Sequence, residues 1–167
     1  PNAGHTLEFD NQKYVLNTIP SGIFNEKTMN LIGGGVVIDP IILKRELDAL
    51  KANGFDPVAA GKLLIARKAH LILPTHQLLD AASESKMGES KIGSTLEGIG
   101  PTYMDKTGRN GLRVGDILLP DFKDRYERLV NKHKSILSHY GEIPDFSEKE
   151  QKFFEAVEFL RSIPQVD

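Results

Sequence analysis

The sequence predicts an α/β fold in which a mostly parallel sheet is flanked by helices. Two short apolar runs, residues 31–38 and residues 62–66, have the composition of buried strands in a parallel sheet. Between them, the pair Asp39-Pro40 predicts a helix start, because aspartate caps free backbone amides and proline suits the first helical position. A strand, a helix and a second buried strand form a βαβ-like unit, and this unit defines the class.

The chain begins with a predicted hairpin. Apolar and polar residues alternate over residues 7–9, residues 13–16 form a second strand, and the pair Asp10-Asn11 between them is a turn signal. His5 therefore lies at the mouth of a sheet. A lone histidine is more often structural, but the amide, glycine and hydroxyl beside it give a functional role equal weight.

The first buried strand and the helix after it both contain informative glycines. Glycines 33–35 interrupt the strand, and they mark either a bulge or a close approach by a neighbour or ligand. Leucines recur along one face of the helix, and Asn53-Gly54 closes it with a residue that can adopt a left-handed conformation.

Three further helices are predicted in the rest of the chain. One begins at Pro74, one runs from Asp121 to Gly141, and one is opened by a capping box at residues 147–150 and ends before Pro164. The final third of the chain is therefore helical.

Four histidines in these regions are interpreted as structural or surface residues. His70 and His76 are six residues apart, so they do not share a helical face at metal-ligand spacing. We interpret both as structural. His133 and His139 are interpreted as helix-surface residues.

Residues 92–116 form the most distinctive segment. It holds six of the fifteen glycines, together with Ser94, Thr95, Lys106, Arg109 and Arg113. Glycine lets the backbone approach a ligand closely, while hydroxyls, amides and guanidinium groups bind phosphate oxygens. A mobile linker can have the same glycine content, but it does not need the apolar residues that can anchor this segment to a core. We therefore interpret the segment as an anion-binding loop.

Composition narrows the classes of function. With 167 residues, 40% of them hydrophobic, the chain can form one domain with a core. A net charge of −2 provides no global basic field, so no nucleic-acid partner is predicted. The chain has no cysteine, which excludes disulfides and is typical of the cytoplasm. No membrane span or signal peptide is predicted.

The common short signatures of catalysis are absent. The sequence has no GxxxxGK[ST] phosphate loop, no nucleophile elbow, no HExxH zinc motif and no GxGxxG fingerprint. Two polar, glycine-containing segments remain, residues 2–6 and residues 94–113, and each is suited to holding a phosphorylated ligand. The residues alone therefore predict a nucleotide-handling site.

Several motifs in order resemble the adenylosuccinate synthetase family. They are NAGHTL at residues 2–7, IPSGI at residues 19–23, GxGVVIDP at residues 33–40, GIGPxYxDK at residues 98–106 and GLRVGD at residues 111–116. The resemblance covers essentially the whole chain. It implies a core like that of P-loop NTPases and a ligase that joins IMP to L-aspartate with GTP and Mg²⁺. The γ-phosphoryl group would go first to the purine 6-oxygen, and the aspartate amine would then displace phosphate.

The resemblance assigns roles to the first glycine-containing segment. His5 matches the histidine that donates a proton or hydrogen bond to the phosphoryl group in transit. Asn2, Ala3 and Gly4 match residues that line IMP, together with His5. The Gly4 carbonyl matches a Mg²⁺ ligand, and Gly4, His5 and Thr6 match positions beside GTP.

The resemblance also assigns roles in the second segment. Thr95 matches the threonine that binds the IMP phosphate. Arg109 matches an arginine that reaches IMP in the neighbouring subunit, so the active site is expected to be shared across a homodimer, with Arg113 at the interface. Glu97 and Asn110 depart from the family pattern, and both lower the positive charge of the loop.

The resemblance further implies an internal fragment of a cytosolic enzyme. The chain begins at Pro1 without an initiator methionine, and the family's phosphate loop, aspartate-binding loop and guanine-recognition segment have no match in it. We divide the chain into a sheet and helix part (1–66), a helix with the IMP-binding loop (67–119) and a helical part (120–167). The expectation is an inactive fragment of the enzyme; the alternative is a non-catalytic nucleotide-binding or dimerisation module.

Overall fold

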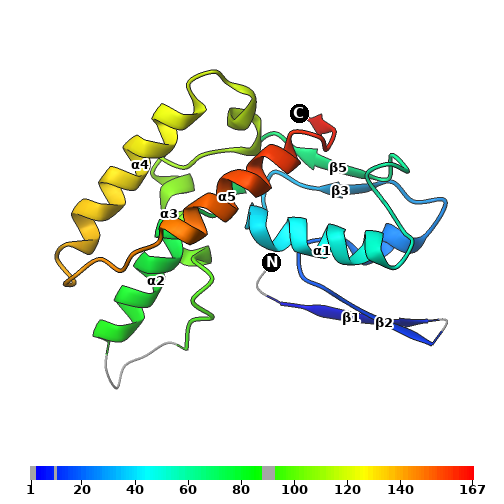
Figure 1. Ribbon diagram of the computed structural model, residues 1–167, viewed down its shortest axis with the longest axis horizontal. Helices are drawn as coiled ribbons and strands as arrows, with labels where there is room; N and C mark the ends of the chain where they lie inside the picture. Colours follow the sequence, from blue (N-terminus) through cyan, green and yellow to red (C-terminus); the bar gives the residue numbers. More distant parts are fainter. Residues whose placement is uncertain (1–2, 10, 88–92) are drawn as a thin grey trace.

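A computed structural model describes residues 3–9, 11–87 and 93–167, and it confirms the α/β class. The helices are α1 (Pro40–Ala52), α2 (Pro74–Lys86), α3 (Ile99–Thr107), α4 (Phe122–Leu137) and α5 (Ser147–Leu160), with short 3-10 helices at Ser21–Phe24 and Val114–Leu118. Figure 1 shows α2, α3 and α4 grouped on one side of the molecule, the sheet and α1 on the other, and α5 running from the first group to the second.

Parallel strand pairs form the centre of the fold. In one sheet, β3 (Asn30–Ile32), β5 (Leu63–Ala66) and β7 (Gln165–Val166) are parallel neighbours in the order β3-β5-β7. A second parallel pair joins β4 (Val37–Ile38) to β6 (His70–Leu71). The predicted βαβ unit is thus present, with α1 as the helix that connects the parallel strands. The strand after Pro164 was not predicted, because only two of its residues pair.

The prediction of one strand over residues 31–38 is wrong. The chain instead forms β3 and β4, separated by a turn in which the Val36 amide donates to the Gly33 carbonyl at 3.2 Å. The physical reason is this turn; close approach, one of the two alternatives for the glycines, is found at Gly34 but, among the described residues, not at Gly33 or Gly35. A Cβ on Gly34 would lie 3.1 Å from the Cβ of Lys68.

Helix α1 forms as its start and stop signals predict. The Asp39 side chain accepts hydrogen bonds from the amides of Ile41, at 2.8 Å, and Ile42, at 3.3 Å. The helix ends beside Gly54, whose φ of 84° is in the left-handed region. The buried leucines of the helix are Leu43, Leu47 and Leu50.

The predicted hairpin is also confirmed. Strands β1 (His5–Phe9) and β2 (Gln12–Leu16) are antiparallel, with His5 opposite Leu16. In Figure 1 the hairpin lies beyond α1, apart from the parallel strands. Aromatic contacts connect it to the core: Tyr14 packs on Phe24 and Phe24 packs on Phe55, with ring centroids 4.6 and 5.5 Å apart.

The last two helices form with different ends from those predicted. Helix α4 stops at Leu137, four residues before Gly141, and the Asp121 side chain accepts from Arg125 instead of capping the helix. The capping box at the start of α5 does not form. Glu150 instead accepts a hydrogen bond from the Tyr126 hydroxyl at 3.0 Å, which connects α5 to α4.

Within the described residues, none of the helices is long and apolar enough to cross a membrane.

Candidate functional site

The first predicted segment lies at the start of β1. His5 begins the strand, and its Nε2 atom is buried without a hydrogen-bond partner among the described residues. Gly4 packs against Asn17, because a Cβ on Gly4 would lie 2.8 Å from the Asn17 Oδ1 atom. Ala3 and Thr6 are exposed on either side. The structure thus brings these positions together, while Asn2 lies outside the described residues.

A buried glutamate from α1 holds the segment that contacts Gly4. The Glu46 carboxylate, 5% exposed as a residue, accepts hydrogen bonds from the amides of Asn17 at 2.6 Å, Thr18 at 3.1 Å and Ile19 at 3.1 Å. Sequence reasoning missed this role. The available signal was a charged residue on the leucine face of an amphipathic helix.

Substitution of Glu46 by glutamine is expected to lower the free energy of unfolding by about 1.5–3 kcal/mol, because an amide replaces a charged acceptor of three backbone amides. Urea unfolding of the chain measures this loss. The control is Asp48→Asn on the exposed face of the same helix, where an ion pair with Lys44 is screened by solvent. Equal destabilisation by the two substitutions would contradict a special role for Glu46.

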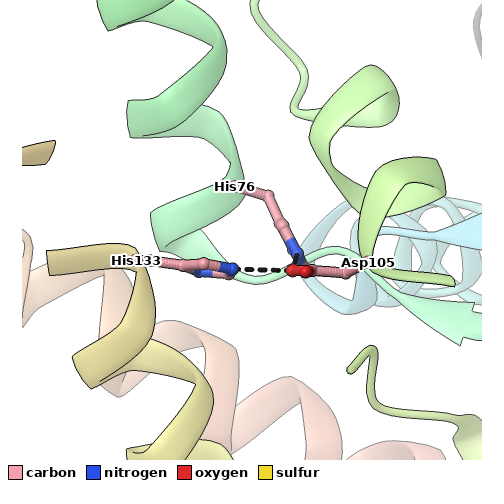
Figure 2. A group of neighbouring side chains, drawn as sticks. All are labelled: His76, Asp105 and His133. Carbon is pink, nitrogen blue, oxygen red and sulfur yellow. Dashed lines mark hydrogen bonds and ion pairs between the residues drawn. The ribbon is translucent and has the colours of Figure 1, made fainter. Parts of the chain in front are cut away.

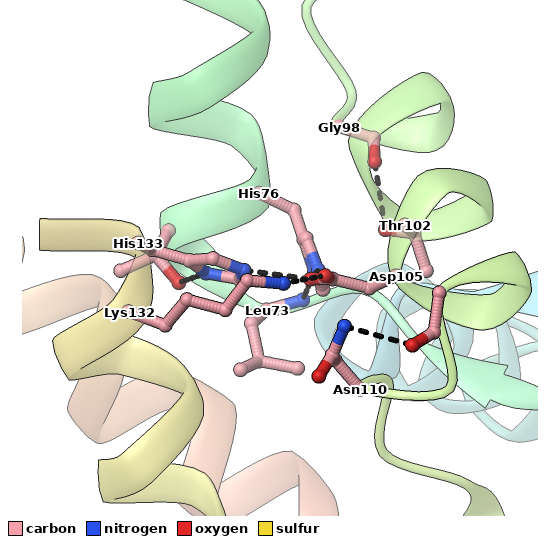
Figure 3. Close-up of polar contacts among 10 residues, drawn as sticks. Leu73, His76, Gly98, Thr102, Asp105, Asn110, Lys132 and His133 are labelled. Carbon is pink, nitrogen blue, oxygen red and sulfur yellow. Dashed lines mark hydrogen bonds and ion pairs between the residues drawn. The ribbon is translucent and has the colours of Figure 1, made fainter. Parts of the chain in front are cut away.

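The second predicted segment is not a continuous loop. Residues 93–98 lead into α3, which begins after Gly98. Gly98 has a φ of 77°, and a Cβ there would lie 2.8 Å from the Gln77 amide nitrogen, so the position requires glycine. The Thr102 hydroxyl donates to the Gly98 carbonyl at 2.7 Å (Figure 3). The glycine-rich composition therefore predicted a loop where the chain forms the helix α3.

Two carboxylates of α2 hold the loop around Thr95. Glu84 Oε1 accepts from the amides of Gly93 at 2.7 Å and Ser94 at 3.2 Å. Asp80 accepts from the Ser94 hydroxyl at 2.7 Å and from the amide of Gly98 at 2.9 Å. The amides of Gly93, Ser94 and Gly98 therefore donate to carboxylates of α2 in this structure, and the prediction of an anion-binding loop stays a prediction. Thr95 itself is exposed.

Arg109 lies at the other end of α3, in a tight turn. It is exposed and has a φ of 60°, and the next two amides, those of Asn110 and Gly111, donate to the Asp105 carbonyl at 2.9 and 3.1 Å. The Asn110 side chain donates to the Gly108 carbonyl at 2.9 Å, so the departure at this position suits the turn. Thr95 and Arg109 flank opposite ends of α3, a helix about 13 Å long, and Thr95 does not line the cavities beside Arg109.

A basic cavity opens beside Arg109. It has a volume of about 320 Å³ and is lined by His70, Lys106, Arg109, Gly111, Arg113, Asp116 and Arg125. Burial lowers the pKa of His70, and the neighbouring charges of Lys106 and Arg113 lower it further. Because these cations lie around one cavity, its field attracts anions.

The helix α3 is also attached to the glycine turn between β3 and β4. The Lys106 ammonium donates to the Gly34 carbonyl at 2.8 Å, and the Tyr103 hydroxyl donates to the Gly35 carbonyl at 2.9 Å. The sequence did not predict these contacts, because the paired residues are about seventy positions apart. They connect two of the motifs that carry the family resemblance.

A buried cluster joins the three helices α2, α3 and α4. Asp105 Oδ2 lies 2.9 Å from His76 Nε2 and 2.7 Å from His133 Nε2 (Figure 2). Lys132 donates to Asp105 Oδ1 at 2.7 Å. The interpretation of His133 as a surface residue is wrong, since it is 1% exposed; it follows Leu129 by four residues and so shares the apolar face. His139 is exposed, as predicted.

The hydrogen bonds of this cluster do not suit a metal ion. The His76 Nδ1 atom accepts from the Leu73 amide at 2.9 Å, so the ring proton is on Nε2, where it is donated to Asp105 (Figure 3). A neutral imidazole protonated on Nε2 has no lone pair there for a metal. Burial alone would raise the pKa of Asp105, but the hydrogen bonds from His133, His76 and Lys132 hold it well below its usual value.

Acidification is expected to destabilise the chain in two steps. Burial lowers the pKa of both His76 and His70, so below about pH 6.5 the unfolded chain binds protons that the folded chain does not. Each group then lowers stability by up to about 1.4 kcal/mol per pH unit. The pKa of Asp105 is also lowered, so its contribution is present above about pH 3.9 and lost as the pH falls further.

Urea unfolding midpoints between pH 7.5 and 5, the range of about one to two units around the histidine pKa, measure the first step. The variant His76→Gln should have a shallower decline than the parent chain, whereas His139→Gln, changed at an exposed position, should not. An unchanged slope in His76→Gln would show that other groups cause the loss.

The fold and the basic cavity define a parallel α/β protein with an anion-attracting site. Residues 1–166 match the family model described as adenylosuccinate synthetase. The chain therefore belongs to the adenylosuccinate synthetase family.

Individual proteins agree with this assignment. The chain is 60% identical over its whole length to the adenylosuccinate synthetase of Christiangramia forsetii and 59% identical to that of Flavobacterium psychrophilum, and it spans 40% of each relative. The fully ligated adenylosuccinate synthetase structure from Plasmodium falciparum is 29% identical, with a TM-score of 0.80, and the match covers 96% of this chain and 36% of that one. The predicted family and the predicted fold class are both confirmed.

Proposed function

We propose that this chain supplies part of the active site of a GTP-dependent ligase that joins IMP to L-aspartate to form adenylosuccinate, the first committed step from IMP to AMP. The observation that carries the proposal is the family match over residues 1–166. The chain spans about 40% of the length of its curated relatives. The activity is therefore proposed for the intact gene product and not for these 167 residues alone. The cytoplasm is the proposed compartment.

In this proposal the segment at the start of β1 handles the transferred phosphoryl group. His5 donates a proton or hydrogen bond to that group. Its buried Nε2 atom has no hydrogen-bond partner among the residues that the structure describes, which supports this role because a bound ligand would satisfy it. Asn2, Ala3 and Gly4 line IMP, and Gly4 to Thr6 lie beside GTP. A side chain on Gly4 would have to displace the Asn17 side chain, whose Oδ1 atom lies 2.8 Å from the position of a Cβ.

The same segment would provide one ligand for Mg²⁺. The Gly4 carbonyl is a hard oxygen donor of the type that Mg²⁺ prefers, and Gly4 is exposed at the edge of the hairpin. These features fit the ion. When bound, Mg²⁺ would neutralise charge on the phosphates of GTP.

The central part of the chain, residues 67–119, would bind IMP in two half-sites. Thr95 binds the IMP phosphate of its own subunit, and Arg109 reaches IMP in the neighbouring subunit of a homodimer. Their positions at opposite ends of α3 support this division. The charge of residues 93–98 also supports it, because this segment contains Glu97 and no lysine or arginine. A phosphate bound there would need a cation from another part of the protein.

The proposed reaction has two steps. The γ-phosphoryl group of GTP is transferred to the purine 6-oxygen of IMP, which leaves GDP. The amine of L-aspartate then attacks carbon 6, the carbon–oxygen bond breaks, and inorganic phosphate leaves. The protein residues act by positioning and by stabilising charge on the oxygens in transit.

The test is adenylosuccinate formation by the intact gene product, measured by chromatography with each component omitted in turn. Product is expected only when IMP, L-aspartate, GTP and Mg²⁺ are all present. A protein that binds IMP and dimerises but forms no product would instead be the nucleotide-binding or dimerisation module that the sequence left as the alternative. Product formation without GTP would contradict the proposed chemistry.

A further inference from the structure

We propose that Asp105 is a positioning residue for Arg109: by fixing α3 between α2 and α4, it sets the place of the turn that presents Arg109 to IMP. The inference rests on the proposed function, because it gives Arg109 its role there. Asp105 is buried and does not line the basic cavity, so it would act through the turn and not by contact with a ligand.

The side chain of Asp105 fixes α3 from two sides. It accepts from His76 of α2 and from both Lys132 and His133 of α4 (Figure 3). Two of these donors are themselves held in place: His76 accepts from the Leu73 amide, and His133 Nδ1 lies 2.7 Å from the Thr75 hydroxyl. Rotation or sliding of α3 would break several charge-assisted hydrogen bonds at once, and the two from His76 and His133 are buried, where such bonds are strong.

The main chain of the same residue closes the Arg109 turn. The Asp105 carbonyl accepts from the amides of Asn110 and Gly111. Gly111 is also packed tightly, since a Cβ there would lie 2.7 Å from His70 Cδ2 and 3.4 Å from the Asp105 carbonyl carbon. The turn therefore has little freedom relative to Asp105, and displacement of this residue would move Arg109 with it.

The far side of the turn is fixed independently. The Leu71 amide of β6 donates to the Leu112 carbonyl at 2.8 Å, and the Val114 amide donates to the Ala69 carbonyl at 2.8 Å. Arg109 thus lies in a short connection between the β6 region and α3. The β6 contacts hold one end, and Asp105 holds the other.

The experiment is a double-mutant cycle on IMP kinetics in the intact gene product. Asp105→Asn is expected to raise the KM for IMP about tenfold, because a small displacement of a binding group has a large kinetic effect, while the KM for GTP changes little. In an Arg109→Ala background the same substitution should have almost no further effect on the KM for IMP, because the residue through which it acts is gone. A merely structural defect would act equally in both backgrounds, and additive effects would overturn the proposal.

Two further variants keep the test decisive. Lys132→Met removes the partner on the solvent side of the cluster, where the lysine side chain is 42% exposed; if Asp105→Asn does not fold, this variant carries the cycle, with a smaller rise in KM. Tyr126→Phe removes the hydroxyl that donates to Glu150 of α5 without touching the cluster or the turn, and it should lower stability but leave the KM for IMP unchanged. A parent protein that forms no adenylosuccinate would refute the proposed function itself, whereas an active parent with additive variants refutes only the role of Asp105.

Discussion

Replacement of His5 by alanine in the intact gene product is expected to lower kcat for adenylosuccinate formation by about 10²–10⁴-fold, the usual contribution of a positioned proton or hydrogen-bond donor. The group acts on the phosphoryl oxygens while they carry the most charge, so its loss should affect kcat more than the KM for IMP or GTP. Steady-state kinetics with each substrate varied in turn measure how far kcat and each KM change.

The same substitution at His5 should lower activity without lowering the stability of the folded protein. The His5 Nε2 atom is buried and unpartnered within the described residues, and an unsatisfied polar atom costs about 1–3 kcal/mol. His5→Ala removes that cost, although it also loses some packing, so the unfolding midpoint should stay level or rise. The control His139→Ala, at an exposed position on the surface, should leave both kcat and stability unchanged. A stable His5→Ala protein with native kcat would remove this residue from the mechanism.

The parts of the fold that could be predicted are those specified by neighbouring residues. Asp39 and Pro40 begin α1 because one side chain and one ring act on the amides directly beside them. The hairpin follows from alternation and a turn signal. By contrast, β7 (Gln165–Val166) exists because β5 offers it an open edge, and a two-residue strand leaves no pattern in the sequence.

The parts of the site that could not be predicted depend on distant partners. Asp105 contacts residues 27 to 29 positions away on two other helices, and no local pattern identifies such a group. His133 differs, because its spacing from Leu129 placed it on the buried face, and its polarity led to the wrong interpretation. The helix α3 was missed because Gly98, Gly100 and Pro101 are typical of loops, although proline is tolerated in the first turn of a helix.

The proposed roles of Gly4, His5, Thr95 and Arg109 come from the family resemblance, and the residues alone predict only a nucleotide-handling site. The structure adds a physical reason for dividing that site. Before α3, the segment that carries Thr95 is held by the carboxylates of Asp80 and Glu84, and after α3, Arg109 lies beside a basic cavity. Residues 93–98 contain no lysine or arginine, so a phosphate bound by Thr95 would need a cation from another part of the protein.

Arg109→Ala is expected to abolish most activity at low IMP concentration, and mixing it with His5→Ala should restore part of it. If Arg109 serves the neighbouring subunit, the heterodimer contains one intact site, because the Arg109→Ala subunit keeps its own His5 and receives Arg109 from its partner. Random mixing of equal amounts makes half of the dimers mixed, each with one working site of two, so about a quarter of the parent activity should return.

The control mixture pairs His5→Ala with Thr95→Ala. Both residues belong to the same subunit's site in this proposal, so each site of the mixed dimer lacks one of them, and no activity should return. Recovery in the first mixture and none in the second can arise only if Arg109 acts across the interface while His5 and Thr95 act within one subunit. Absence of recovery in both mixtures, with subunit exchange confirmed by differently tagged chains, would place Arg109 in the site of its own chain, and α3 would then have to bend or move to bring it to Thr95.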